Sequence, residues 1–268
     1  MYRLVHPTSV QLSAHDRAPQ LKLSDDRLTV TGEKGYSVVR ASHSVNRGSW
    51  YYELEIVDQP LGSHCRFGWS QPLGCVQAPV GYDRFSYSWR SRKGTCFHDS
   101  RGKHYAETGF WQGDVLGTLI ELPQSTVAPA SSSSSSIKLP SPRKTLPLIK
   151  FKNHLYYEEK DEPQKVKRAL KPLPGSRISF YKNGRCVGVA FQDVYQGDYF
   201  PAVSLFGSIA VRANFGPEFR YPPPQRSAVE SRMQPVSCRA TELPVEQALS
   251  DVLYFVENEN CLRKQMFE

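Results

Sequence analysis

The sequence predicts an all-β fold, an antiparallel β-sandwich followed by a short C-terminal amphipathic helix. Three observations lead to this prediction. The 14 tyrosines and 13 phenylalanines among 268 residues favour β-structure. The run Trp50–Ile56 alternates between apolar and polar residues, as a half-buried strand does. The pair Asn183-Gly184 separates two strand-like runs and favours the type I′ turn of a tight hairpin.

The first elements are short. Residues 1–20 show little periodicity, so we expect them to form a loose lead-in to a domain over residues 21–221. Within this domain, Gly32–Gly35 predicts a turn between two strands, Leu28–Val30 and Ser37–Val39.

The run Trp50–Ile56 is the clearest strand of the first half. Two of its side chains, Glu53 and Glu55, are expected to point away from the core. The others would share one buried face, which suits an antiparallel sheet with one solvated side: Trp50, Tyr52, Leu54 and Ile56.

Residues 124–147 differ from the rest of the domain in composition. They contain several prolines and the six consecutive serines Ser131–Ser136. Such a segment buries too little apolar surface to offset its ordering entropy, so we expect a disordered loop inserted in the sandwich. After it, Leu148–Phe151 and Leu155–Tyr157 are predicted as short strands, and the charged run Glu158–Lys171 as a turn or two of exposed helix.

The predicted hairpin pairs Ile178–Tyr181 with Cys186–Phe191. Asn183-Gly184 can supply the two positive φ angles that its turn requires. Strands near Phe200–Phe206 and Ala210–Phe215 would complete the sandwich.

A linker and a helix are expected after the domain. Residues 222–243 are rich in proline and polar residues, and Pro244 opens a helical pattern that we expect to run over 244–258. Its apolar stripe has the spacing of one helix face: Val245, Leu249, Val252, Leu253 and Val256.

Composition limits the classes of partner and compartment. The net charge of +8 suits an acidic partner, either nucleic acid or a protein segment rich in Asp and Glu. The chain has no apolar run of about 18 residues and no apolar signal-peptide core at its start, so we expect it in the cytosol or nucleus. Its 6 cysteines show no Cys-x-x-Cys spacing, so we expect free thiols and no structural zinc.

The sequence offers no recognisable catalytic site. The 7 histidines are scattered, and the nucleophile-elbow, zinc-protease and phosphate-loop motifs are missing. His98 and His104 flank a polar stretch that we interpret as a solvated loop, and nothing marks Cys96 as a nucleophile. We therefore expect a protein that is not an enzyme and uses no metal or cofactor.

The stretch Arg66–Arg90 interleaves arginines and aromatic residues with Pro and Gly turns. Arginine pairs with carboxylates through two parallel hydrogen bonds, and tyrosine adds contact area at low entropic cost. The stretch can therefore form a shelf for an acidic, partly apolar peptide. The alternative is that its aromatic residues belong to the core and its arginines to the solvated surface.

Several strings in fixed order resemble known proteins. Those in the second half resemble a SPRY domain, a β-sandwich that grips peptides: Gly113–Gly117, Ile178–Gly184, Tyr199–Leu205 and Asn214–Gly216. Longer strings resemble the SPRY subunit of SET-domain histone methyltransferase complexes, the Ash-two-like (trithorax-group) family: His15–Val30, Gly32–Ser37, Val39–His43, Arg66–Arg90 and Gly102–Tyr105. The likeness covers about residues 15–257 apart from the serine-rich insert.

This resemblance implies a nuclear, non-catalytic adaptor. The family's SPRY domain binds a short acidic segment of a β-propeller subunit of the retinoblastoma-binding protein five type. Together they support the SET-domain enzyme that methylates lysine four of histone H3. In the resemblance, Arg66 and Arg90 would pair with carboxylates. The family's peptide-binding positions fall on Tyr36, Arg66, Pro79, Tyr82 and Arg90.

The resemblance also assigns a partner to the C-terminal helix. In the family this helix docks on a small dimeric helical protein of the Dumpy-thirty type, and the apolar stripe defined above matches it in place and spacing. The alternative is that the helix folds back on the sandwich.

The sequence departs from the family at three places. Many members carry a zinc-finger-like and winged-helix region ahead of the SPRY domain, whereas this chain starts at Met1 almost at the domain boundary, so DNA binding by such a region is not expected. The serine-rich insert and the end, Asn258–Glu268, also differ.

Two other binding functions stay open. A SPRY module can recruit substrates to a ubiquitin ligase, although no RING or SOCS-box-like segment is visible. Basic clusters such as Arg90–Lys93 could make a weak contact with nucleosomal DNA, although such clusters are usually solvated faces.

Overall fold

The computed structural model describes residues 7–123, 148–151, 154–157, 162–223 and 233–266. They fall into two compact units, one within the bounds 1–123 and 171–268 and the other within 124–170. No helix in the described part of the chain is long and apolar enough to cross a membrane.

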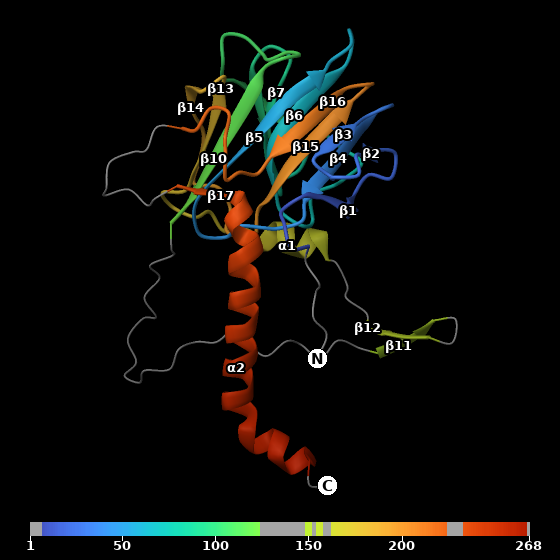
Figure 1. The fold of residues 1–268 in the computed structure, drawn as a ribbon, viewed down its shortest axis with the longest axis vertical. Helices are drawn as coiled ribbons and strands as arrows, with labels where there is room; N and C mark the ends of the chain where they lie inside the picture. The colour runs from blue at the N-terminus through green and yellow to red at the C-terminus, as the bar shows by residue number, and fades with distance from the viewer. Residues whose placement is uncertain (1–6, 124–147, 152–153, 158–161, 224–232, 267–268) are drawn as a thin grey trace. The chain divides into compact units, whose positions relative to one another are not determined.

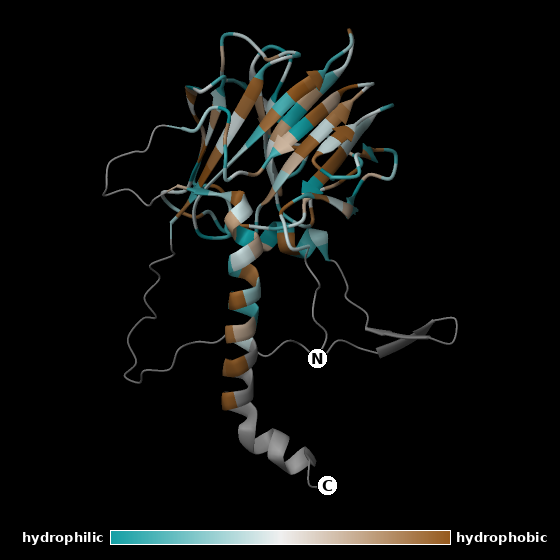
Figure 2. Ribbon diagram, viewed as in Figure 1, coloured by the Kyte–Doolittle hydropathy of each residue, from teal (hydrophilic) through white to brown (hydrophobic). Residues whose placement is uncertain are grey.

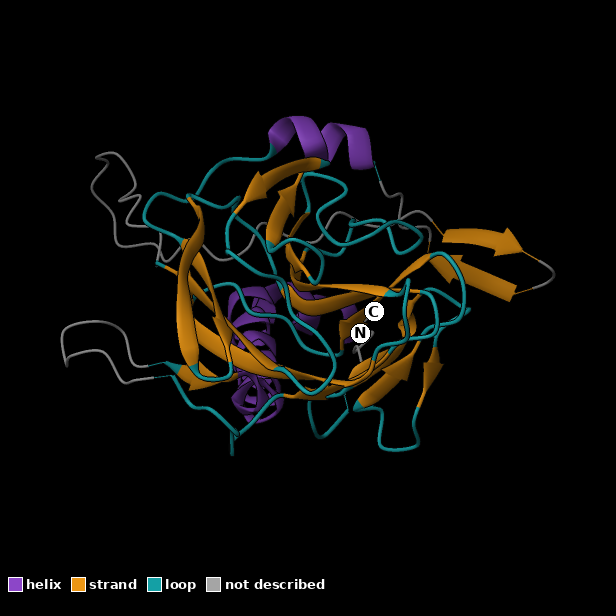
Figure 3. Cartoon of the chain, turned by 90° about the horizontal axis from the view of Figure 1, so that it is seen from above, coloured by secondary structure: helices purple, strands orange, loops and turns teal. Residues whose placement is uncertain are grey.

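The first unit is a sandwich of two β-sheets (Figures 1 and 3). In spatial order, the seven-stranded sheet contains β1 Leu12–Arg17, β4 Tyr36–Ala41, β15 Phe200–Phe206, β6 His64–Ser70, β7 Ser86–Arg90, β8 Thr95–His98 and β9 Arg101–His104. The eight-stranded sheet contains β14 Arg185–Gln192, β13 Arg177–Lys182, β10 Val115–Leu122, β5 Gly48–Asp58, β16 Ala210–Asn214, β3 Thr29–Thr31 and β2 Lys22–Leu23, with β17 Gln234–Pro235 paired to β5. All pairings except that of β17 are antiparallel, so the predicted fold class is confirmed.

Aromatic side chains fill the space between the sheets. Phe67 of β6 meets Phe180 of β13 edge to face, with 5.2 Å between ring centroids. Two hydrogen bonds also cross this space, from Trp69 Nε1 to Thr118 Oγ1 at 3.0 Å and from the Tyr52 hydroxyl to the Gly68 carbonyl at 2.6 Å. The polar atoms of Tyr52 and Trp69 therefore find partners inside the core, as those of buried aromatic residues usually do.

The segment expected as a loose lead-in contains a strand. Residues 12–17 form β1, which pairs with β4 at the edge of the seven-stranded sheet. The buried Arg40 of β4 holds this strand because its guanidinium donates to both carboxylate oxygens of Asp16 at 2.7 Å. This bidentate bond joins residues that are 24 positions apart in the sequence. The strand therefore depends on a distant partner, which the periodicity of residues 1–20 could not show.

The turn at Gly32–Gly35 lies where we predicted it, but it does not close a hairpin. It connects β3 of the eight-stranded sheet with β4 of the seven-stranded sheet. By contrast, the hairpin of β13 and β14 forms as predicted, with φ of 49° at Asn183 and 81° at Gly184.

Strand β5 is buried on more of its surface than the alternation predicted. Glu53, expected to face solvent, is only 1% exposed. Its carboxylate accepts bonds from the backbone N–H groups of Arg220 and Tyr221, both at 2.8 Å. On the same face, Tyr51 packs edge-on against Phe219 at 4.8 Å. The chain after β16 thus folds back over this sheet, which a pattern within β5 cannot show.

The second unit contains three short elements. β11 Leu148–Phe151 pairs with β12 His154–Tyr157, close to the predicted strands. Helix α1, Pro163–Ala169, lies within the predicted charged helical run and begins with proline in its first turn. The predicted disordered insert, residues 124–147, lies outside the described residues.

The C-terminal helix begins earlier and ends later than predicted. After the 3-10 turn η1, Val236–Cys238, helix α2 runs over Arg239–Met266 with Pro244 inside it. The first turn is held by Arg239, whose Nε donates to the Ser44 carbonyl at 3.0 Å and whose guanidinium stacks 5.6 Å from the Trp50 ring. These tertiary contacts start the helix before Pro244. Residues 224–232 of the predicted linker lie outside the described residues.

Candidate peptide-binding site

Three of the five predicted peptide-binding residues come together on the outer face of the seven-stranded sheet: Tyr36, Arg66 and Arg90. Arg66 of β6 lies directly opposite Arg90 of β7. Its neighbours along β6, Cys65 and Phe67, are core residues, so Arg66 points away from the core. Tyr36 comes from β4, and the other two residues lie on the loop between β6 and β7: Pro79 and Tyr82.

Aromatic rings flank Arg66 on two sides. Its Cζ lies 3.8 Å from the ring centroid of Phe97 on β8 and 5.5 Å from that of Tyr36. Arg90 also faces Phe97, at 5.8 Å. Cation–π contacts of this kind fix the guanidinium planes without neutralising their charge.

The two arginines have no acidic counterpart in the described part of the chain. No carboxylate there lies within ion-pair distance of either guanidinium. Both Nε atoms are buried without a hydrogen-bond partner, and Arg66 is only 8% exposed. Burial, together with the charge of Arg90, lowers the pKa of Arg66, while Tyr36 acts in the opposite direction. An external carboxylate would therefore relieve an unfavourable concentration of positive charge.

The loop that carries Pro79 and Tyr82 is clamped onto the sheet through Val80. The Val80 N–H donates to Ser204 Oγ at 3.1 Å, and its carbonyl accepts from Ser88 Oγ at 2.6 Å. Serines of β15 and β7 are small enough to leave room for this backbone. Tyr82 on this loop is 54% exposed.

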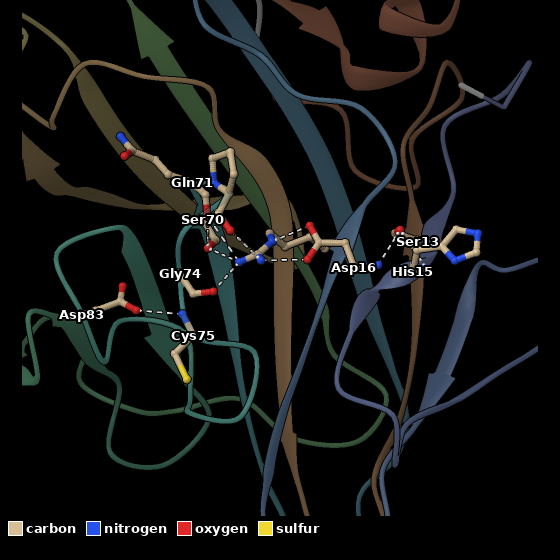
Figure 4. A network of polar contacts seen from close by, with 10 residues as sticks. Ser13, His15, Asp16, Ser70, Gln71, Gly74, Cys75 and Asp83 are labelled. Carbon is tan, nitrogen blue, oxygen red and sulfur yellow. Dashed lines mark hydrogen bonds and ion pairs between the residues drawn. The ribbon is translucent and has the colours of Figure 1, made fainter. Parts of the chain in front are cut away.

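A polar network supports this loop from its other end (Figure 4). Asp83 accepts from the backbone N–H groups of Cys75 at 2.9 Å and Phe85 at 3.0 Å, which ties the loop's beginning to its end. The guanidinium of Arg40 also donates to the turn that precedes Cys75, through Ser70 Oγ and the carbonyls of Gln71, Pro72 and Gly74. The loop is thus pre-organised without a ligand.

Three residues next to the site were not predicted. Phe97 lies under both arginines, and Phe206 of β15 packs 4.9 Å from Tyr36. The His64 ring stacks on Phe206, with 6.1 Å between centroids. No motif marks these positions, because only the register of β4, β15, β6 and β8 makes them neighbours.

A second candidate surface lies along α2. All five residues of the predicted stripe are exposed, from 36% for Leu253 to 67% for Val245 and Val256. Figure 2 shows the hydrophobic residues repeating along this helix. These exposed fractions show that the described part of the chain leaves the stripe largely uncovered.

The residues considered for catalysis lie in surroundings that suit packing rather than chemistry. Burial raises the pKa of the Cys96 thiol, which disfavours the reactive thiolate. His98 stacks on Tyr87 at 4.0 Å, and burial lowers its pKa. Among the described residues, no group of His, Cys, Asp and Glu side chains could hold a metal ion.

The SPRY-domain model matches residues 49–128 and 153–218. The chain belongs to the SPRY-domain family. The match contains four of the five proposed site residues and leaves out only Tyr36, which lies on β4.

Relatives confirm the likeness to the Ash-two-like family. The chain is 51% identical to the Set1/Ash2 histone methyltransferase complex subunit ASH2 of Drosophila melanogaster, over 98% of this chain and 45% of the relative. It is 43% identical to the subunit ash-2 of Caenorhabditis elegans, over 96% and 43%, and 31% identical to the Set1 complex component ash2 of Schizosaccharomyces pombe, over 94% and 42%. The chain spans less than half the length of these relatives.

Proposed function

We propose that this SPRY protein is a non-catalytic, nuclear adaptor subunit of a histone H3 lysine-four methyltransferase complex. Its relatives are named as subunits of Set1-type complexes, which supports a SET-domain methyltransferase as partner. The sandwich binds an acidic segment of a propeller subunit of the retinoblastoma-binding protein five type. The C-terminal helix binds a dimer of the Dumpy-thirty type.

One observation carries the peptide assignment. Arg66 and Arg90 lie opposite each other on the adjacent strands β6 and β7. Among the residues that the structure describes, no carboxylate forms an ion pair with either of them. Like charges directly opposite each other in a sheet are unfavourable. Two positive charges side by side do not stabilise the fold. A ligand rich in Asp and Glu would form a charge-assisted contact with each arginine.

The helix assignment rests on the exposed stripe. An isolated helix of this kind is marginal in water, and its apolar residues favour a partner that covers them. Arg47 Nη2 bonds Glu246 Oε1 at 2.7 Å, and Arg239 Nε bonds the Ser44 carbonyl at 3.0 Å, so the start of α2 is fixed to the sandwich. The two partners would therefore bind distinct surfaces of one chain, as an adaptor requires.

A two-partner binding assay tests this function. Arg90→Glu is expected to abolish binding of the acidic propeller segment and to leave the Dumpy-thirty-type dimer bound. The double variant Leu249→Glu/Leu253→Glu is expected to do the opposite.

The matched control is Gln247→Glu/Ser250→Glu, which adds the same charge on the other side of α2 and should retain both partners. Binding of the dimer by the double leucine variant would refute the helix assignment. Binding of the acidic segment by Arg90→Glu would refute the peptide assignment.

A further inference from the structure

His64 extends the arginine site along the outer face of the sheet. It precedes Arg66 by two residues on β6, so both side chains lie on the same face. Its ring is nearly parallel to that of Phe206, at an interplanar angle of 16°. Phe206 in turn packs on Tyr36, one of the predicted site residues. Through Phe206, the imidazole of His64 therefore adjoins the aromatic ring of Tyr36 at the edge of the site.

The groups around His64 are cationic or neutral. Arg90 and the exposed Arg92, from β7 and the residues after it, are the charged groups that act on the imidazole. Towards β15 and β4, its neighbours are the uncharged rings of Phe206 and Tyr36. The Nδ1 atom is buried without a hydrogen-bond partner. Burial first, and then Arg90 and Arg92, lower the pKa of His64.

We infer that His64 is a proton-dependent member of the acidic-peptide site, which takes up a proton when peptide carboxylates occupy Arg66 and Arg90. The inference rests on the proposed function, since an acidic peptide must bind there. Its consequence is that the sandwich binds acidic segments more tightly as the pH falls towards that of a mildly acidic medium.

The sign follows from linkage. Peptide carboxylates cancel part of the arginine field, so the pKa of His64 is higher in the complex than in the free protein. Binding then takes up a proton, and affinity rises as the pH falls through the pKa of the complex. A difference of about one pKa unit corresponds to about a tenfold change in Kd. The carboxylates themselves stay ionised above about pH 5.5, so they do not reverse this trend.

The test measures Kd by calorimetry between about pH 5.5 and about pH 7.5, the range in which histidine titrates. The probe is a blocked peptide of alternating Glu and Asp residues around one Leu. The wild-type protein is expected to bind it about tenfold more tightly at the lower pH. In buffers of different ionisation enthalpy, the wild-type protein should also show proton uptake on binding.

Three variants complete the design. His64→Ala and the permanently charged His64→Arg should both lose the pH dependence, whereas His104→Ala, at an exposed histidine on β9, should keep it. An unchanged pH slope in His64→Ala, or no proton uptake by the wild-type protein, overturns the inference. Arg66→Ala tests the proposed peptide binding separately from the role of His64. If this variant binds the peptide as well as the wild-type protein at every pH, or if the wild-type protein does not bind it, the proposed function and this inference both fail.

Discussion

Replacing Arg66 with alanine should weaken peptide binding while leaving the sandwich folded. In the free protein, Arg66 makes one long bond, from Nη1 to the Val80 carbonyl at 3.5 Å, and stacks on Phe97 at 3.8 Å. Because the guanidinium is buried, its stacking on Phe97 and on Tyr36, 5.5 Å away, is worth about 2 kcal/mol. Repulsion from Arg90, directly opposite on β7, costs about 0.2–1 kcal/mol. The repulsion offsets only part of the stacking, so Arg66→Ala should lower the melting temperature by a few degrees without unfolding the sandwich.

Binding should respond much more strongly than stability. Removing one partner of a desolvated charge pair costs about 2–5 kcal/mol, which raises Kd by about tenfold or more. Calorimetry with an acidic peptide measures the loss, and thermal unfolding measures stability on the same sample.

Arg212→Ala is the matched control, because it removes the same charge from the other sheet, where Arg212 pairs with Asp26 at 3.0 Å. This control should keep wild-type affinity. An unchanged Kd for Arg66→Ala, with the sandwich still folded, would refute the assignment of Arg66 to the peptide site. Loss of affinity together with unfolding of the sandwich would instead show that Arg66 is a structural residue.

Three further perturbations test the surrounding structure. Glu53→Gln should lower stability by about 1–3 kcal/mol in thermal unfolding, because a buried carboxylate that accepts two backbone N–H groups at 2.8 Å is replaced by an amide; wild-type stability would show that this bonding is dispensable. Gly81→Ala should weaken peptide binding, because φ is +87° and the new Cβ would lie 2.5 Å from the Phe97 carbonyl; unchanged affinity would mean that the loop adapts freely. The hydrogen bond from Arg239 is the main cause that lowers the pKa of Glu246, so the stabilisation it gives is present above the ordinary value of 4.5 and is lost as the pH falls below it. The protection factors of the amides at the start of α2, which compare exchange with the intrinsic rate at each pH, should therefore fall in acid in the wild-type protein but stay constant in Glu246→Gln; the same fall in both would exclude this ion pair as its cause.

Local sequence determined the elements whose chemistry is contained within a few residues. Asn183-Gly184 specified the hairpin because both positions adopt positive φ at little cost. The alternation in Trp50–Ile56 identified a strand, and the spacing from Val245 to Val256 identified one helix face. The ordered strings shared with the Ash-two-like family also led to the five proposed site residues, and the structure brings three of them together: Tyr36, Arg66 and Arg90.

Long-range pairing decided the rest. The sequence around Gly32–Gly35 marked a turn but not that it joins two different sheets, and nothing in residues 12–17 announced a partner on β4. The alternation predicted an exposed Glu53 because the segment that covers it lies far along the chain. Its backbone donors, Arg220 and Tyr221, follow it by 167 and 168 residues. Phe97 and His64 lie next to the site only because of the order and register of the strands that carry them. Turns and alternation depend on neighbours in the chain, whereas burial and the composition of a surface depend on which strands lie side by side, and only the assembled sheets determine that.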